Sequence, residues 1–288
     1  MEQCKICNTT NNGIALLTIE GRNVLRCQNC ELEWLSPQLN DAEITALYSE
    51  NYYKAWGIKG STENSATLNM KKATARLRIA LLKKHITSGN MLDVGCANGY
   101  FLEAAVEQGF QPYGVELSEY SSGLAKQKFG ASNIYHGILE TCEFNESFFD
   151  AINMADLLEH VKSPEETLNK ARQLLKPKGV LIITTPDSGS FSKMVFGKRW
   201  PHYKLEHFFY FNTKNIEQIA DKCGLKLIEA ENSKKALNLA YLNTQYKVYP
   251  HWFFTPAFKS LNVLLPKALL NYNFYVLTGE ITVLLTHK

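Results

Sequence analysis

The sequence predicts an α/β fold built on a doubly wound parallel sheet, preceded by a small cysteine-bearing module. Short apolar runs alternate with helical patterns between residues 91 and 187, as is typical of parallel strands joined by crossover helices. The first of these runs, MLDV, leads into a turn with two glycines four residues apart, GCANG. Two Cys-x-x-Cys pairs lie near the N-terminus, outside the alternating region.

Length and composition set wide limits on the function. At 288 residues, with 45% apolar residues, the chain can form one large domain with a proper core and a small accessory module. Lys and Arg number 31 and Asp and Glu 28, so the overall charge favours no class of partner. No apolar run of about 18 residues is present, and MEQCKIC lacks a signal peptide's apolar core. We expect a cytoplasmic protein without a transmembrane segment.

Four of the seven cysteines have the spacing of a structural zinc site. Cys4 and Cys7 are followed, after nineteen intervening residues, by Cys27 and Cys30, and two such pairs can give four thiolates to a tetrahedral Zn²⁺. The segment between them has two strand-like runs hinged at residues 20–22, which would carry the second pair back towards the first. We expect a zinc ribbon over residues 1–40; four unrelated buried cysteines, or a redox pair, are the alternatives.

The charge of the predicted ribbon argues against nucleic acid as a partner. Residues 1–40 hold three basic and four acidic side chains, whereas a nucleic-acid reader needs a basic face, because phosphate contacts supply most of its affinity. A structural role beside a substrate site is the better interpretation.

Residues 41–90 are predicted to form a helical connector or cap. Asn40 or Asp41 is the expected capping residue of a first helix, and residues 69–86 have the pattern of an amphipathic helix. Between them, Tyr52, Tyr53 and Trp56 lie close together. The two tyrosines are candidate substrate contacts, with core packing as the alternative for this cluster.

The glycine turn and a following acid predict a nucleoside-type site. Glycines between a strand and a helix let a ligand approach the backbone at the helix N-terminus. The next strand-like run, PYGVELS, carries Glu116 seventeen residues after Gly99, where such sites place the carboxylate that binds ribose hydroxyls. Further strands are predicted at 133–137, 148–156 and 179–187, with a helix from Ser163 and Pro164 between the last two. Gly95, Glu116 and Asp156 would then share the carboxyl edge of the sheet.

The chain resembles class I S-adenosylmethionine-dependent methyltransferases over about residues 75–232. Four motifs carry the resemblance: LDVGCANG, GVELS, FFDAINMADLLEHV and LLKPKGVLIITTPD. The resemblance implies a Rossmann-like seven-stranded sheet in a domain spanning residues 91–288, with S-adenosylmethionine as cofactor. A nicotinamide enzyme would instead favour GxGxxG. The family implies that the glycine loop holds the methionine part, that Glu116 holds the ribose, and that Ile138 and Leu139 flank the adenine. Many members carry an acid in place of Ile138, so the adenine amino group would need the backbone or a side chain such as Glu140. The implied cofactor-binding residues are Asp93, Gly95, Cys96, Ala97, Gly99, Glu116, Leu117, Ile138, Leu139 and Asp156.

The chain also resembles a subgroup of methyltransferases with an N-terminal zinc-binding region, some of which methylate carbons of nucleotide-linked sugars. This second resemblance lies in the predicted ribbon, the YSENYY segment and residues 197–225. The chain is also similar to ubiquinone-type O-methyltransferases. Both groups place a Glu-His pair after the fifth strand, which Glu206 and His207 match. An imidazole can remove a proton at neutral pH, so the candidate catalytic residues are His207, Glu206 and Tyr203. A structural His207 remains the alternative. His160, four residues after Asp156 on a predicted helix, would share a face with it.

The C-terminal region predicts an antiparallel strand pair around an insertion. Residues 225–231 and the final run from residue 273 have strand patterns, leaving an insertion at about 233–271 that is rich in aromatic residues. Residues 233–288 carry six lysines and one acid, Glu280. We expect the aromatic residues of this insertion to serve apolar packing or a homodimer contact, and binding of lipid or nucleic acid is the alternative. The expected function is methyl transfer to a small-molecule substrate, and the expected substrate is a nucleotide-linked sugar. The alternatives are O- or N-methylation of another small molecule, and a role in binding nucleic acid or a partner without turnover.

Overall fold

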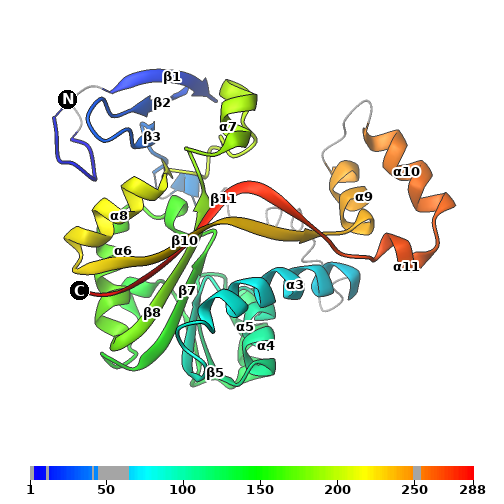
Figure 1. Cartoon of the computed structure of the whole chain (residues 1–288), viewed down its shortest axis with the longest axis horizontal. Coiled ribbons are helices and arrows are strands. Elements are labelled where there is room, and N and C mark those ends of the chain that lie inside the picture. Colours follow the sequence, from blue (N-terminus) through cyan, green and yellow to red (C-terminus); the bar gives the residue numbers. More distant parts are fainter. Residues whose placement is uncertain (1–2, 11–12, 41, 45–64, 249–253) are drawn as a thin grey trace.

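The computed structural model describes residues 3–10, 13–40, 42–44, 65–248 and 254–288. The seven-stranded sheet at its centre has the strand order β10-β11-β8-β7-β4-β5-β6 (Figure 1). The strands from β8 to β6 are parallel, while β11 runs antiparallel to both β8 and β10. This confirms the predicted α/β fold with seven strands. They are β4 (Gly89–Val94), β5 (Phe110–Glu116), β6 (Ile134–His136), β7 (Phe149–Ala155), β8 (Leu175–Pro186), β10 (Leu225–Leu237) and β11 (Phe274–His287).

Helices cover both faces of the sheet, as a doubly wound topology requires. One buried cluster joins the sheet to α3, α4 and α5, and a larger one joins it to α6 and α8. The ligand-bearing edge of such a sheet is its carboxyl edge, where the loops after β4, β5 and β7 meet. The helices are α3 (Ser65–Leu82), α4 (Tyr100–Glu107), α5 (Glu119–Phe129), α6 (Pro164–Leu174) and α8 (Thr213–Lys222).

The boundary between α6 and β8 differs from the sequence expectation. The helix ends at Leu174 and the strand begins at Leu175, four residues before the predicted start. Leu175 pairs with Phe149 of β7, and the register then shifts before Ala151 pairs with Val180. Pairing with a neighbouring strand therefore overrides the helical pattern of the residues after Leu174.

The N-terminal module is a four-stranded antiparallel sheet of β1 (Ile14–Ile19), β2 (Arg22–Arg26), β3 (Glu33–Ser36) and β9 (Phe209–Tyr210). Glu20 and Gly21, both with positive φ, form the tight turn between β1 and β2, which matches the predicted hinge. The fourth strand, β9, comes from the main domain and pairs with β3. In addition, the Asn215 side-chain amide at the start of α8 donates to the Cys30 carbonyl at 2.7 Å. The module is therefore joined to the main domain through its own sheet.

The connector is described at its two ends. Asn40, one of the two predicted capping residues, acts as a cap, because its Oδ1 accepts from the Glu43 N–H at 3.0 Å and Glu43 Oε2 accepts from the Asn40 N–H at 2.8 Å. This is a reciprocal capping box. Asp41 and residues 45–64, with the tyrosine and tryptophan cluster predicted there, lie outside the described residues.

A C-terminal arm projects from the sheet (Figure 1). Beyond the pairing of Glu280 with Pro186, β10 and β11 continue as a two-stranded ribbon that ends where Leu237 pairs with Phe274. The base of the arm packs on α3 through Met70, Ala73 and Ala236. Among the described residues, no helix is long and apolar enough to cross a membrane. The arm's helices are α9 (Leu239–Val248), α10 (Phe254–Leu264) and α11 (Lys267–Leu270), so the predicted insertion is largely helical.

We expect Asn215→Ala to loosen the module from the main domain. Asn215 is fully buried, and its loss leaves the Cys30 carbonyl without that donor, which lowers the free energy of unfolding by about 1–3 kcal/mol. Urea unfolding followed by tryptophan fluorescence measures this, with the exposed Asn145→Ala as control. Equal midpoints for the two variants would contradict the assigned role.

Candidate active site

The turn after β4 has the backbone that the sequence predicts. Gly95, Ala97 and Gly99 all have positive φ, at 77°, 48° and 83°. A side chain at Gly99 would overlap the Phe129 ring, whereas a Cβ at Gly95 would meet Leu157 at 3.7 Å with no nearer atom among the described residues. Gly99 is thus required for packing, while Gly95 keeps one side of the turn open to a ligand.

Glu116, at the end of β5, ties this turn to the next strand. One carboxylate oxygen accepts from the Ala97 N–H and the other from the Ser118 N–H, both at 2.8 Å. The side chain is buried, and burial raises its pKa. Because each carboxylate oxygen has a second lone pair, Glu116 can still accept from ligand hydroxyls while it holds the turn in place.

Asp93 and Cys96 support the turn from inside the protein. Asp93 Oδ1 accepts from the Asn153 side-chain amide at 2.6 Å, and burial raises the pKa of Asp93 to about 7. Cys96 is 1% exposed, and its Sγ occupies the space beside Gly114. The predicted ligand role of Cys96 therefore falls to its backbone, since its side chain is enclosed.

Two exposed apolar side chains mark the predicted adenine end. Leu117 is 55% and Ile138 46% exposed, on the loops after β5 and β6. Leu139, which was predicted to flank the adenine together with Ile138, is instead buried in the main core, because residues 139–141 form a 3₁₀ turn that points it inward. The Glu140 carboxylate, the alternative adenine contact, accepts from the Thr167 hydroxyl.

Asp156 lies in a network of four charges. It follows β7 with a φ of 53°, and its carboxylate contacts Arg78 of α3 at 3.4 Å and Lys235 of β10 at 3.1 Å. Lys235 also pairs with Glu280 of β11 at 2.6 Å. The two cations hold the pKa of Asp156 well below its usual range, and its side chain stays 43% exposed. Arg78 and Lys235 were not predicted from the sequence, because no local motif surrounds either.

Two polar atoms of this network have no hydrogen-bond partner within the described part of the chain. They are Arg78 Nε and Glu280 Oε2, both buried. Buried polar atoms are normally paired, so unpaired ones beside a ligand-binding edge indicate places that a bound molecule can complete.

His160 and His207 form an edge-to-face pair, with ring centroids 4.7 Å apart. His160 Nδ1 donates to the Glu206 carbonyl at 2.9 Å, because a carbonyl oxygen can only accept. Burial lowers the pKa of both rings, strongly for His207, which is 4% exposed. Both rings are therefore neutral at pH 7. The prediction that Asp156 and His160 share a helix face is wrong, because the left-handed Asp156 backbone leads only into a 3₁₀ turn at 158–160.

Glu159 completes this buried group and was not found from the sequence. It is 1% exposed and accepts from the Thr185 hydroxyl at 2.8 Å, while its other oxygen lies 3.9 Å from His160 Nε2. Burial, with Asp156 adding to it, raises the pKa of Glu159 to about 8. Ligand atoms of Glu159, His160 and His207 lie within 4.8 Å of one another. With the pKa of Glu159 raised and those of both imidazoles lowered by burial, the group holds a neutral acid beside two neutral rings at pH 7, and these can hold or exchange protons.

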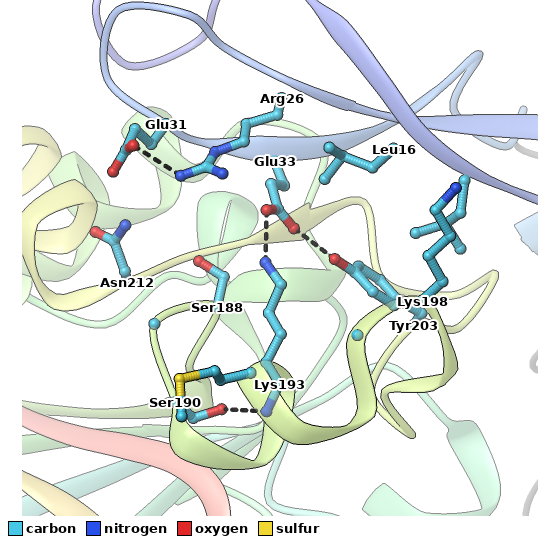
Figure 2. Close-up of a pocket in the computed structure, with 14 residues that line it drawn as sticks. Leu16, Arg26, Glu31, Glu33, Ser188, Ser190, Lys193, Lys198, Tyr203 and Asn212 are labelled. Atoms are coloured by element: carbon cyan, nitrogen blue, oxygen red, sulfur yellow. Dashed lines mark hydrogen bonds and ion pairs between the residues drawn. The ribbon is translucent and has the colours of Figure 1, made fainter.

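A pocket of about 390 Å³ lies between the N-terminal module and α7 (Phe191–Phe196), as Figure 2 shows. Glu33 of β3, 2% exposed, accepts from Lys193 Nζ at 2.5 Å and from the Tyr203 hydroxyl at 2.9 Å. Arg26 and Glu31, which belong to the same module as Glu33, pair at 2.7 Å and also line the pocket. Burial and, after it, the Glu33 carboxylate raise the pKa of Tyr203, which stays a hydrogen-bond donor.

The predicted catalytic residues therefore occupy two places. Tyr203 lines the pocket beneath the module, whereas His207 lies in the buried group. Tyr210, which is fully buried, contacts both rings, with centroids 5.0 Å from Tyr203 and 6.1 Å from His207. Glu206 contributes its backbone carbonyl to His160.

The four N-terminal cysteines converge through two matching turns. Cys4 Sγ lies 3.5 Å from Cys30 Sγ, and Cys7 Sγ lies 3.6 Å from Cys27 Sγ. In each Cys-x-x-Cys turn, the residue after the second cysteine has a positive φ and donates its N–H to the carbonyl of the first, as Asn8 does to Cys4. All four sulfurs lie within 4.8 Å of one another. A tetrahedral Zn²⁺ with Zn–S of about 2.3 Å separates its sulfurs by roughly 3.8 Å, so these four residues fit a zinc ion.

Comparisons with known proteins agree on one family. A family model described as a methyltransferase domain matches residues 67–230. A ubiquinone biosynthesis O-methyltransferase from Coxiella burnetii is 26% identical over 207 residues, which cover 68% of this chain and 86% of that protein. Its namesake from Idiomarina loihiensis is 32% identical over 154 residues, covering 50% and 60%.

A solved structure supports the same fold. The 1,6-didemethyltoxoflavin-N1-methyltransferase of Burkholderia thailandensis, crystallised with 1,6-didemethyltoxoflavin and S-adenosylhomocysteine, matches with a TM-score of 0.52. The match covers 94% of this chain and 98% of that one at 13% identity. At this identity the likeness concerns the fold.

We expect Glu159→Gln to change the pH dependence of stability. The pKa of Glu159 rises from an ordinary 4.5 to about 8 on folding, so the folded state binds the extra proton and wild-type stability falls as pH rises through this window. As pH rises through this window, the free energy of unfolding of the variant increases relative to that of the wild type by up to about 1.4 kcal/mol per pH unit. Urea unfolding at pH 5 and pH 8 measures the difference, with the exposed Glu146→Gln as control. A difference that does not vary with pH would refute the raised pKa.

Proposed function

We propose that the methyl acceptor is a nucleotide-linked sugar. The proposal starts from the family: the chain belongs to the methyltransferase domain family and is an S-adenosylmethionine-dependent methyltransferase that acts on a small molecule. S-adenosylmethionine, when bound, supplies a methyl group already activated on a sulfonium sulfur. The tasks left to the protein are alignment, exclusion of water and, where the acceptor requires it, removal of a proton.

The cofactor would bind along the carboxyl edge from β7 to β6. The open side of Gly95 and the N-terminus of α4 support placing the methionine part there, with the unpaired Arg78 Nε at the same edge. Glu116 retains lone pairs for the ribose hydroxyls. Leu117 and Ile138 offer exposed apolar surfaces for an adenine ring. Asp93 and Cys96 act from beneath the turn.

The pocket beneath the module is the observation that carries the acceptor proposal. It is lined by three basic side chains, Arg26, Lys193 and Lys198, and two acidic ones, Glu31 and Glu33, together with serine hydroxyls. Arg26 and Lys193 already pair with Glu31 and Glu33, so Lys198 is the lining cation for which no ion pair is found among the described residues, and it can meet a phosphate group. The serine hydroxyls and the exposed Glu31 can hydrogen-bond to sugar hydroxyls. Such a lining suits a hydroxylated, phosphate-bearing acceptor better than an apolar one.

His160 is the better candidate for the base. Its side chain is 16% exposed, and its Nδ1–H is held by the Glu206 carbonyl, which leaves Nε2 as the accepting nitrogen of a neutral ring. His207 packs edge-to-face with the His160 ring and is enclosed. Glu159, protonated at pH 7, holds a proton 3.9 Å away. His160 does not line the pocket beneath the module. We therefore propose that the phosphate-bearing end of the acceptor lies in that pocket and that its reacting end extends to the carboxyl edge, where His160 takes the proton and His207 and Glu159 keep the His160 ring in place.

Methylation of a hydroxyl on another small molecule is the second candidate. The relatives named ubiquinone biosynthesis O-methyltransferases favour it, because the alignment covers 86% of the Coxiella burnetii protein. A hydroxyl acceptor would make the same demand on His160, since its proton must also leave.

Calorimetry separates the two candidates. Wild-type protein saturated with S-adenosylhomocysteine is titrated with a panel of sugar nucleotides and with catechols, and methyl transfer to any binder is followed with radiolabelled cofactor. The proposal is supported if a sugar nucleotide binds and is methylated, and if its affinity is lower in Lys198→Ala than in the control Lys178→Ala. Methylation of a catechol alone would transfer the assignment to O-methylation.

The four cysteines are inferred to hold a structural Zn²⁺. Their sulfur spacings and matching turns support this, and the ion would fix the module on which one wall of the acceptor pocket depends.

We expect Cys7→Ser with Cys30→Ser to remove zinc and destabilise the module more than it weakens cofactor binding. The matched control is Cys142→Ser with Cys223→Ser, which changes two buried cysteines outside the cluster. Metal analysis by mass spectrometry after dialysis gives the readout. One full equivalent of zinc in the double variant would rule out the site.

Gly95→Arg is expected to abolish binding of S-adenosylhomocysteine while the chain stays folded, because the long side chain would fill the open side of the turn. Gly109→Arg is the control, since Gly109 also has a positive φ and a Cβ there meets no described atom within 4 Å. Calorimetry measures the affinity, and unchanged binding in Gly95→Arg would overturn the assignment of the turn.

His160→Ala should lower kcat by about 10²–10⁴-fold through loss of the base, with the affinity for S-adenosylhomocysteine unchanged. His207→Ala should have a smaller effect, because that ring is enclosed. Steady-state kinetics across pH measures both, and the acidic limb of the profile should disappear in His160→Ala. A larger effect at His207 would reverse the two roles.

A further inference from the structure

We propose that the C-terminal arm binds an anionic lipid surface through its tip, a property that goes beyond the proposed function and does not depend on the acceptor. The apolar tip comprises Val263, Leu264, Leu269 and Tyr272, which are 79%, 77%, 54% and 69% exposed. They lie within ten residues of chain, at the end of α10, on α11 and just after it. Large apolar side chains gathered at one end of an element mark an interaction site.

The charges around the tip have one sign. Residues 238–272 contain three lysines and no aspartate or glutamate. Lys259 on α10 and Lys267 at the start of α11 are both exposed and flank the apolar tip. Lysines beside exposed apolar residues on short helices suit a membrane interface, where the cations meet anionic headgroups and the apolar side chains enter the acyl boundary. Tyr272 is a residue type enriched at such interfaces.

The charge pattern favours lipid over a second copy of the chain. If two arms met tip to tip, the lysines of each would face those of the other, with no acid in residues 238–272 to balance them. A surface of anionic headgroups is instead complementary to every charge on this segment.

The arm also has a fixed relation to the active site. Its base is formed by the same strands that supply Lys235 and Glu280 to the network around Asp156. The arm therefore rises from the carboxyl edge of the sheet (Figure 1), and a bound tip would hold that edge near the lipid surface.

Vesicle co-sedimentation of the whole protein tests the proposal. The probes are vesicles of phosphatidylcholine alone and of phosphatidylcholine with phosphatidylglycerol in equal parts. We expect binding to the mixed vesicles, weakened by salt. Val263→Asp should bind about tenfold more weakly, through loss of one buried valine side chain. Val106→Asp is the matched control, because Val106 is also exposed and is also the next-to-last residue of its helix, α4.

Thermal melting followed by circular dichroism checks that Val263→Asp and Val106→Asp remain folded. The double variant Lys259→Glu with Lys267→Glu tests the attraction between the lysines and the anionic headgroups without changing an apolar residue. Weak binding of both tip variants, with normal binding of Val106→Asp, supports the proposal. No binding by the wild type, or equal binding by Val263→Asp and Val106→Asp, overturns it. A dimer in sedimentation velocity that Val263→Asp dissociates, without vesicle binding, would make the tip a protein–protein surface and also overturn it.

Discussion

The ion pairs around Asp156 connect the parts of the molecule that surround the active site. One carboxylate at the end of β7 is held by Arg78 from α3 and Lys235 from β10, and Lys235 is shared with Glu280 of β11. A partly buried charge network of this kind is stable only when every member is paired, since removing one leaves an uncompensated charge. The position of α3, the direction of the arm and the shape of the sheet edge therefore depend on one another.

Behind this ionised network lies a group of buried side chains that are neutral at pH 7. Burial raises the pKa of Glu159 to about 8 and lowers the pKa of His160 and His207. Neighbouring carboxylates thus differ in charge for a physical reason, because Asp156 has two cations beside it and Glu159 has a hydroxyl. A paired charge network beside a separate neutral acid and base lets the site accept a proton while the charges of the network stay unchanged.

The N-terminal module belongs to the site rather than standing apart from it. Its sheet takes its fourth strand, β9, from the segment just after His207, and Glu33 of the module meets Lys193 and Tyr203 of the main domain. Through this pairing the cysteine cluster, the pocket wall and the histidine pair are positioned by one short stretch of chain. An ion held by the cysteines would therefore act, through packing, on the pocket beneath the module.

The sequence by itself determined what depends on neighbouring residues. The alternation of apolar runs predicts the doubly wound sheet, the spacing of Gly95, Gly99 and Glu116 predicts the turn and its acid, and the cysteine spacing predicts the converging thiols. Arg78, Lys235 and the contact between Glu33 and Tyr203 were found only in the tertiary structure, as was the inward position of Leu139. These residues come from segments far apart in the chain, and no short-range pattern records which side chains packing will bring together.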